Sequence, residues 1–299
     1  MPTKISLDYG QTIFNLAWFV AQEEGLFAKE GLEVEFVRAR DRDTSLPPEM
    51  DPAKVHPFWR HSPFEDGEAQ VFEACEWGQV SRSRASTIGG RIIQMRSAMV
   101  SQAIFTRPDS PISHPQALRN KAIAVNFHAS SHYVTLSLLE GFMARDEIKV
   151  LHFGQARARY EAMMSGAADA ATLSEPYIAL AEKQGCQLIA EAFFPGAEIA
   201  APDLDDDTLE AANRAIVKAV DLINANKRKY VHHLVEDLPK DLGPLTIEDF
   251  QLDRIRYIHP KPYPPDQFER TRAWMLSWGL IDEDACFDNI VDSRIGVAR

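Results

Sequence analysis

The chain has 299 residues, of which 45% are hydrophobic, so it is long enough to bury one or two sizeable cores. Its 32 Lys and Arg residues against 44 Asp and Glu residues give a formal charge of −12, which argues against long-range attraction to nucleic acid. An anionic ligand therefore needs a local pocket that is basic or rich in N–H groups, and no window approaches the ~18 apolar residues of a membrane-spanning helix.

The first predicted elements are a strand, a helix and a second strand. Residues 1–7 run directly into an apolar strand pattern without the regions of an export signal. This start favours a cytoplasmic protein, whereas a signal removed upstream would make it periplasmic or secreted. After a break at Gly10, Gln11 and Thr12, residues 15–29 carry a helical apolar face and residues 32–37 alternate as a half-buried strand. This order predicts the unit of a parallel sheet.

A long loop without periodicity follows at residues 38–66. Loops of this length are usually functional or disordered, and the aromatic residues here favour a functional one because large aromatic side chains tend to be buried. After the loop, residues 68–77 are predicted as a helix, and residues 91–95 and 102–105 as strands.

A second series of strands and helices begins after Thr106. It predicts strands at 122–125, 148–153, 168–173 and 186–190, with helices at 131–144, 157–165 and 176–184. Beyond it lies a long amphipathic helix at 206–229, whose acidic start suits the helix dipole. Helices near 246–255 and 265–278 close the chain. We expect an α/β protein with one lobe formed by residues 1–106 plus 193–299 and the other by residues 107–192.

The three cysteines are widely spaced and unpatterned. Cys75, Cys186 and Cys286 make an odd count, which argues against a disulfide framework and against a zinc knuckle. Cys186 opens an apolar run and is interpreted as a strand-packing residue.

Several motifs of the second series occur in a known order. An apolar strand at 122–125 runs into the Ser-rich turn at Ser130 and Ser131, residues 160–171 carry a helix followed by a Gly-x-x-Asp-Ala strand, and Glu175 precedes Pro176. With the helix at 268–281, these segments resemble the nitrate-, sulfonate- and taurine-binding proteins and the thiamine-pyrimidine-precursor synthases. The resemblance implies a two-lobed, type II periplasmic-binding-protein-like fold with a ligand cleft between the lobes.

One branch of that fold family matches further segments. Residues 56–61, 64–68, 77–84 and 106–112 are similar to hydroxybiphenyl sulfinate desulfinases, which, like dihydroxyphthalate decarboxylases, use the fold for chemistry. Those desulfinases carry a catalytic Cys after the first strand, where this chain has Gly10, Gln11 and Thr12, so cleavage through a Cys nucleophile at that place is not supported. Residues 191–206 are short for the strand that normally returns to the first lobe, and the sequence leaves open whether one forms.

The candidate ligand-binding residues follow from this placement. Ser130 and Ser131 open a predicted helix, whose unsatisfied N–H groups and hydroxyls suit a carboxylate, sulfonate or phosphate, although a plain N-cap explains them equally. Glu175 is expected at the rim of the cleft, where it orients a histidine or a substrate amine, or else caps the next helix. The full set comprises Gly10, Gln11, Thr12, Ser130, Ser131, His132 and Glu175.

The candidate catalytic residues are His56, Arg60 and His61 in the long loop. They would supply a proton-transfer group and a fixed cation to a substrate held between the lobes. Their placement is similar to the catalytic His and Arg region of the desulfinases, and ordinary solvated side chains are the alternative.

No metal or cofactor is expected from the sequence. His128 and His132 have a spacing that can present two imidazoles on one helical face, but the chain is expected to bend between them, and no further ligand stands nearby. His232 and His233 are interpreted as a solvated helix end.

Two functions are compatible with these patterns. The first is a cytoplasmic enzyme of desulfinase or decarboxylase type, which cleaves a C–S or C–C bond in a small anionic molecule, with aromatic molecules included in that class. The second is the solute-binding component of an ABC transporter for nitrate, sulfonate, taurine or a pyrimidine, which would have a permease as its partner. Neither function involves nucleic acid or a membrane segment.

Overall fold

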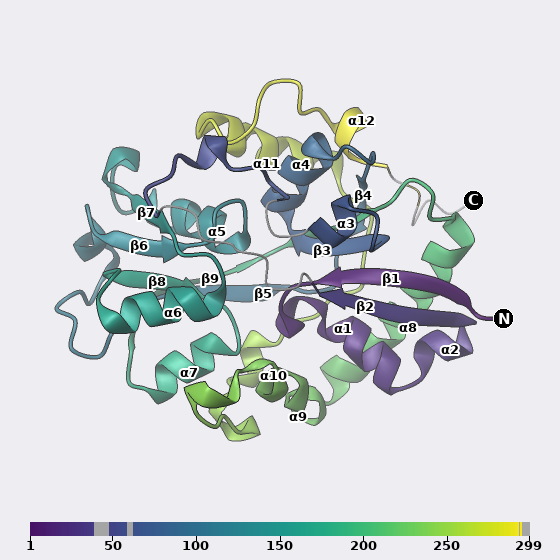
Figure 1. Cartoon of the computed structure of the whole chain (residues 1–299), viewed down its shortest axis with the longest axis horizontal. Helices are drawn as coiled ribbons and strands as arrows, with labels where there is room; N and C mark the ends of the chain where they lie inside the picture. The colour runs from purple at the N-terminus through teal and green to yellow at the C-terminus, as the bar shows by residue number, and fades with distance from the viewer. Residues whose placement is uncertain (39–47, 59–61, 293, 295–299) are drawn as a thin grey trace.

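A computed structural model describes residues 1–38, 48–58, 62–292 and 294. Two five-stranded sheets lie side by side and are flanked by helices (Figure 1). The two-lobed α/β architecture expected from the sequence is confirmed. The proposed catalytic residues Arg60 and His61 lie outside the described residues, whereas His56 lies within them.

The first sheet is mixed and has the strand order β2-β1-β3-β10-β4. Strands β1 and β2 pair in parallel over their full length, from Thr3 opposite Leu32 to Tyr9 opposite Arg38, which confirms the predicted strand-helix-strand unit. Strand β10 runs antiparallel between β3 and β4. The strands are β1 (Thr3–Tyr9), β2 (Leu32–Arg38), β3 (Val71–Cys75), β4 (Arg91–Met95) and β10 (Gly196–Ala200).

The second sheet has the order β7-β6-β8-β5-β9. Strand β6 pairs in parallel with β7 and β8, and β5 runs antiparallel to β8 and β9. The strands are β5 (Val100–Thr106), β6 (Ala122–Val125), β7 (Lys149–His152), β8 (Ala170–Leu173) and β9 (Gln187–Phe194).

The chain passes between the sheets at two short connections. Residues 96–99 join β4 to β5, and Pro195 joins β9 to β10. Strand β10 settles the question that the sequence left open, because a strand does return to the first sheet. The division into residues 1–106 plus 193–299 and residues 107–192 stays a prediction, and the sheet pairing places β5 with the second sheet.

Helices cover both sheets. Helices α1, α2 and α8 pack on the first sheet or on one another, α4 packs on β3, β4 and β10, and α5 and α6 pack on the second sheet. The side chain of Asp205 caps α8 by accepting from the Thr208 N–H at 2.9 Å. The α-helices are α1 (Thr12–Glu23), α2 (Leu26–Lys29), α3 (Ser62–Glu65), α4 (Glu76–Ala85), α5 (Ser130–Leu139), α6 (Ala156–Ser165), α7 (Tyr177–Lys183), α8 (Asp206–Ala225), α9 (Lys227–Tyr230), α10 (His232–Asp237), α11 (Pro265–Ser277) and α12 (Phe287–Ile290).

Two helix predictions were wrong. Residues 68–77 were expected to be helical, but residues 71–75 form β3 in the middle of the first sheet and a helix begins only at Glu76. The Ala, Glu and Gln content of the segment favours a helix, and burial between β1 and β10 overrides that weak preference. Residues 246–255 contain the short 3₁₀ turns Ile247–Asp249 and Leu252–Arg254 instead of a helix.

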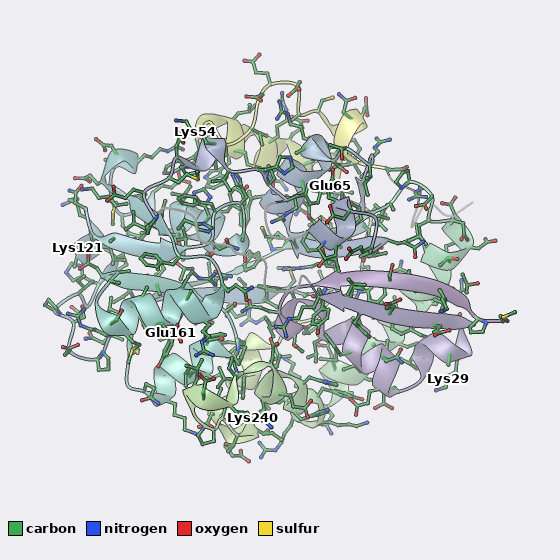
Figure 2. The ribbon with its side chains drawn as sticks, in the orientation of Figure 1. Lys29, Lys54, Glu65, Lys121, Glu161 and Lys240 are labelled. Atoms are coloured by element: carbon green, nitrogen blue, oxygen red, sulfur yellow. The ribbon has the colours of Figure 1, made fainter. Side chains whose placement is uncertain are left out.

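Apolar side chains from both sheets form one buried cluster, and a smaller second cluster lies within the second sheet and its helices. Charged side chains such as those of Lys29, Lys121 and Lys240 lie at the periphery and are exposed to solvent (Figure 2). Among the described residues, no helix is long and apolar enough to cross a bilayer.

Candidate functional site

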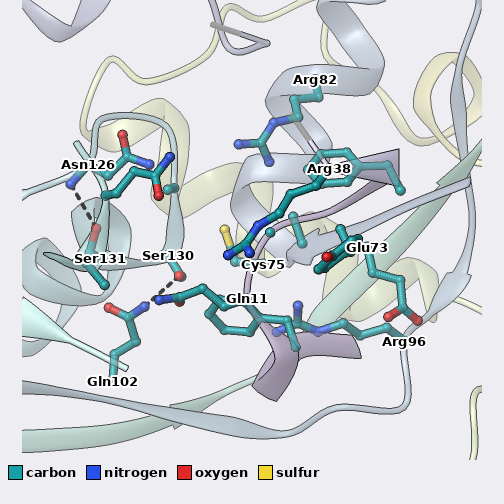
Figure 3. Close-up of a pocket in the computed structure, with 18 of the residues that line it drawn as sticks. Gln11, Arg38, Glu73, Cys75, Arg82, Arg96, Gln102, Asn126, Ser130 and Ser131 are labelled. Atoms are coloured by element: carbon teal, nitrogen blue, oxygen red, sulfur yellow. Dashed lines mark hydrogen bonds between the residues drawn. The ribbon is translucent and has the colours of Figure 1, made fainter. Parts of the chain in front are cut away.

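A cavity of about 130 Å³ lies between the two sheets (Figure 3). Strands β1, β3 and β6 each end at it, and the turns that follow these strands supply part of its wall. Ligands in open α/β sheets bind at such strand ends, because the loops there converge. The wall comprises Tyr9, Gly10, Gln11, Phe14, Arg38, Phe72, Glu73, Ala74, Cys75, Arg82, Arg96, Gln102, Asn126, Ala129, Ser130, Ser131, Gln155, Ala156 and Arg159.

Arg96 is the most unusual group in this wall. Its side chain is 1% exposed, and its guanidinium lies 5.0 Å from the ring centre of Phe14 and 5.7 Å from that of Phe194. Its Nε donates to the Ala98 carbonyl at 3.3 Å, while Nη1 and Nη2 have no hydrogen-bond partner among the described residues. A buried cation with two unsatisfied donor groups is costly, so the cavity favours an anion that accepts from both.

The position of Arg96 depends on a glycine. A Cβ atom at Gly196 would overlap the Nε and Cζ atoms of Arg96 and the carbonyl oxygen of Ala74. Gly196 also accepts a backbone hydrogen bond from the Arg96 N–H at 3.0 Å. The absence of a side chain at the start of β10 thus makes room for the guanidinium.

Two buried carboxyl groups lie on neighbouring strands, and one of them, Glu73, interacts with the charge of Arg96. Glu73 on β3 and Glu198 on β10 are directly opposite one another in the antiparallel register, which points both side chains to the same face. Asn15 donates to Glu73 at 2.7 Å and Gln94 donates to Glu198 at 3.3 Å. Burial raises the pKa of both carboxyls, and the Arg96 charge opposes this rise at Glu73. The pair therefore retains a proton more readily than exposed glutamates do.

A thiol faces the cavity at the start of α4. The Cys75 Sγ accepts from the Gly78 N–H at 3.3 Å and so caps the helix. Burial raises the pKa of the Cys75 thiol, although Arg82 lowers it. The guanidinium of Arg82 donates to the His128 carbonyl at 2.8 Å and to the Pro57 carbonyl at 3.1 Å, so this cation fastens the β6–α5 turn to the first lobe.

The opposite wall is built from neutral polar groups at the start of α5. Ser131 Oγ accepts from the Asn126 N–H at 2.9 Å, and Ser130 Oγ accepts from the Gln102 side chain at 2.7 Å. The side-chain oxygens of Gln102 and Asn126 have no hydrogen-bond partner within the described part of the chain. Figure 3 shows these residues across the cavity from Arg38, Arg82 and Arg96.

The structure brings four of the seven proposed ligand-binding residues to the cavity wall, namely Gly10, Gln11, Ser130 and Ser131. Gln11 Oε1 accepts from the Ser174 hydroxyl at 2.6 Å, which joins the two lobes beside the cavity. Thr12 does not line the cavity, and its backbone N–H donates to Asp237 at 3.1 Å.

His132 and Glu175 are buried but do not line the cavity. His132 packs against the rings of Phe127 and His128, and burial lowers its pKa to about 3, so the imidazole is neutral. Glu175 accepts from the Ala179 N–H at 3.0 Å, and burial raises the pKa of its carboxyl to about 7. Both side chains therefore shape the second lobe from behind the wall.

The proposed catalytic histidine His56 is exposed and is not among the residues that line the cavity. Its Nδ1 accepts from the Phe58 N–H at 3.2 Å, and its ring stacks on that of Phe58. The expected bend between His128 and His132 is present, since α5 begins only at Ser130 and His128 has a positive φ of 56°.

Sequence inspection missed the residues that give the cavity its charge. Glu73 was missed because residues 68–77 were predicted as a helix, and a Glu in an amphipathic helix is expected on its exposed face. Arg96 follows the apolar run of β4 and is buried. A charged residue at the end of such a run is the signal that would have marked it, because Arg is rarely fully buried unless it has a partner.

Beyond the cavity a wider groove of about 750 Å³ opens. It shares Gly10, Gln11, Arg38, Gln155 and Ala156 with the cavity wall and continues to Asp237 at the end of α10. The shared residues make the groove a natural route between the cavity and solvent.

No protein-family model and no curated protein matches the chain, whereas solved structures match it over almost its whole length. The alkanesulfonate-binding protein SsuA from Xanthomonas axonopodis pv. citri, bound to MOPS, has a TM-score of 0.75 at 15% identity and covers 97% of this chain and 98% of that one. The Candida albicans CA3427 gene product, described as having the generic periplasmic binding protein fold, has a TM-score of 0.71 at 12% identity. The match covers 98% of this chain and 97% of that one.

The desulfurization enzyme DSZB is also similar, with a TM-score of 0.63 at 14% identity over 97% of this chain and 96% of that one. At these identities the likeness concerns the fold, and the chain has the type II periplasmic-binding-protein-like fold that its motifs predicted.

Proposed function

We propose that the chain binds a small organic anion in the cavity between the two sheets. The observation that carries this proposal is Arg96, a buried guanidinium in the cavity wall whose two terminal nitrogens have no hydrogen-bond partner among the described residues. A carboxylate, sulfonate, sulfinate or phosphonate presents two oxygens at the spacing that a guanidinium fork binds.

The cavity also limits what the anion is attached to. Its volume of about 130 Å³ is close to the ~150 Å³ of a protein cavity that holds benzene, and Tyr9, Phe14 and Phe72 contribute to its wall. A single ring or a short alkyl chain therefore fits. The alkanesulfonate-binding and desulfurization proteins of the same fold support an anion of sulfur as one member of this class.

Binding is tested by titration calorimetry with benzoate, benzenesulfonate, benzenesulfinate, butanesulfonate and methylphosphonate. Benzamide and benzenesulfonamide, which lack the charge, serve as matched controls. We expect at least one anion to bind in the wild type at least about tenfold more tightly than its neutral analogue, because hydrogen bonds to charged groups contribute about 1.5–3 kcal/mol. Equal affinities for an anion and its neutral analogue would contradict the proposal.

A bond-cleaving enzyme of desulfinase or decarboxylase type is the second candidate. The Cys75 thiol and the Glu73 carboxyl, whose pKa is raised by burial, place proton donors in the cavity wall, which a binding protein does not need. In desulfination, water supplies a proton to the ring carbon and a hydroxide to sulfur, the C–S bond breaks, and the arene and hydrogensulfite leave. In decarboxylation a proton replaces carbon dioxide on carbon.

Sulfite or carbon dioxide released from benzenesulfinate or benzoate would support the enzyme. We retain His56, Arg60 and His61 as proposed catalytic residues, and a turnover in His56→Ala, Arg60→Lys and His61→Ala equal to that of the wild type would remove them. Tight binding without product supports instead a solute-binding component that works with an ABC permease. The enzyme is proposed for the cytoplasm and the binding component for the periplasm, which fractionation of native cells would distinguish.

A further inference from the structure

Three side chains of metal-ligating type meet on the surface away from the cavity. Glu23 is the last residue of α1, and His232 and His233 are the first residues of α10. The Glu23 Oε2 atom lies 2.8 Å from the Nε2 of His233 and 3.6 Å from the Nε2 of His232. One ligand atom from each residue lies within 4.8 Å of the other two.

The imidazole of His232 is oriented by a backbone carbonyl. Its Nδ1 lies 2.9 Å from the Lys229 carbonyl oxygen. Because a carbonyl only accepts, Nδ1 carries the hydrogen, and in the neutral ring Nε2 then presents a lone pair to the Glu23 carboxylate. A lone pair facing a carboxylate oxygen is unfavourable, and either a proton on Nε2 or a metal cation between the two atoms relieves it. A carbonyl bound to the far ring nitrogen is also the usual second partner of a metal-ligating histidine.

His233 is held more firmly than its neighbour. Its side chain is 16% exposed against 37% for His232, and its ring packs 5.8 Å from that of Phe19 and 4.1 Å from that of His232. Glu236 faces the same ring and adds negative charge, while Lys229 is paired with Glu24.

We propose that Glu23, His232 and His233 form a binding site for a divalent transition-metal ion, with zinc as the best fit. Zinc takes two His and one Glu as three of its four ligands, and a fourth position is open to water. Tetrahedral zinc with bonds of about 2.0–2.1 Å needs its ligand atoms about 3.3–3.4 Å apart, and the 2.8 and 3.6 Å separations here bracket that value.

The site would link two helices that border the outer groove. Helices α1 and α10 are already joined at their other ends, where the Thr12 N–H donates to Asp237 at 3.1 Å. Asp237 lines the groove that leads to the cavity. A metal at Glu23, His232 and His233 would therefore fasten the second end of this helix pair and stabilise one side of the groove.

The test is a calorimetric titration of untagged protein with zinc chloride, with a parallel titration of cobalt(II) followed by its visible absorption. We expect one zinc per chain, a tetrahedral cobalt spectrum, and a zinc-dependent rise in melting temperature. His232→Ala, His233→Ala and Glu23→Gln should each weaken zinc binding at least about tenfold, since even an outer-shell partner contributes about 10–100-fold to affinity.

Two control variants separate this site from others. His259→Ala removes an exposed histidine that also pairs with a carboxylate, Asp221 at 2.8 Å, but belongs to no three-ligand cluster within the described part of the chain. Cys286→Ser removes a partly exposed thiol. Both should bind zinc as the wild type does. Wild-type binding no tighter than that of His232→Ala and His233→Ala, or an equal loss in His259→Ala or Cys286→Ser, would overturn the proposal, whatever the outcome of the anion titrations.

Discussion

The two walls of the cavity differ in how their polar groups are satisfied. On the first-sheet side, Arg96 is buried, two of its nitrogens have no hydrogen-bond partner among the described residues, and its charge interacts with the buried carboxyl of Glu73. On the second-sheet side, the hydroxyls of Ser130 and Ser131 are hydrogen-bonded within their own lobe. The first wall thus holds a buried cation with unsatisfied donors, whereas the second wall holds neutral polar groups, including the Gln102 and Asn126 side-chain oxygens that have no partner among the described residues. We therefore expect the first wall to dominate affinity and the second to orient the ligand.

Replacement of Arg96 has the largest expected effect. Arg96→Leu should weaken binding of the best anion from the panel at least about 30-fold, because loss of one partner of a buried charge pair costs about 2–5 kcal/mol and 1.4 kcal/mol is a factor of ten. Calorimetry measures the change. Arg256→Leu, which removes another arginine stacked on an aromatic ring, Phe193 at 3.7 Å, is the matched control and should bind normally. If the affinity of Arg96→Leu stayed within threefold of that of the wild type, the first wall would not dominate anion affinity.

Gly196→Ala should disturb the same wall without removing a charge. The new Cβ would overlap Arg96 and the Ala74 carbonyl, so we expect lower anion affinity together with a loss of stability of about 1–3 kcal/mol. Urea unfolding and calorimetry together test this. Gly141→Ala is the control, since the nearest atom to its Cβ would be at an ordinary 3.9 Å. Normal affinity in Gly196→Ala would mean that Arg96 does not need its present position.

Ser131→Ala tests the second wall. The buried Asn126 N–H would lose its acceptor, which costs about 1–3 kcal/mol of stability. We expect a lower melting temperature and a loss of anion affinity clearly smaller than that in Arg96→Leu. If Ser131→Ala instead weakened binding as much as Arg96→Leu while the melting temperature stayed constant, the hydroxyl would be a direct ligand contact and the contrast between the walls would fail.

The pH dependence of stability probes the carboxyl pair and has the smallest expected effect. Burial raises the pKa of Glu198 well above its ordinary value of 4.5, so the folded chain holds this proton more tightly than the unfolded chain. The resulting stability is complete below pH 4.5 and is lost as the pH rises through the folded pKa. Glu198→Gln cannot titrate, so its urea midpoint should fall less between pH 5 and pH 8 than that of the wild type. Glu33→Gln, at an exposed position, serves as the control. If the urea midpoint changed with pH equally in Glu198→Gln and the wild type, Glu198 would not hold a proton in the folded chain.

Much of the fold was accessible from the sequence because it depends on local periodicity. The alternation at 32–37 and the apolar strand before Ser130 correspond to β2 and β6. Gly10, Gln11, Ser130 and Ser131 line the cavity because they follow strand ends whose positions the pattern gave, and their role in ligand binding stays a prediction.

The charged wall was not accessible in the same way. Glu73 faces Glu198 only because β10 inserts between β3 and β4, and no local signal in residues 191–206 announces that strand. Arg96 becomes important through contacts with Phe14, Phe194 and Gly196, which are distant in sequence. Such groups are brought together by tertiary pairing, and the same holds for Glu23 and His233, which are 210 positions apart.

The two connections between the sheets lie next to one another, because the N–H of Arg96 in the first donates to the carbonyl of Gly196, the residue that follows the second. A rotation of one lobe against the other that left both connections in place would turn about them, and points near a rotation axis travel least. Arg96 belongs to one of these connections, whereas Arg38 ends β2 in the first sheet and Ser130 begins α5 on the second. An anion would thus bind its strongest partner, Arg96, at a place that moves little. The motion of the outer walls would then set the rate at which the anion dissociates.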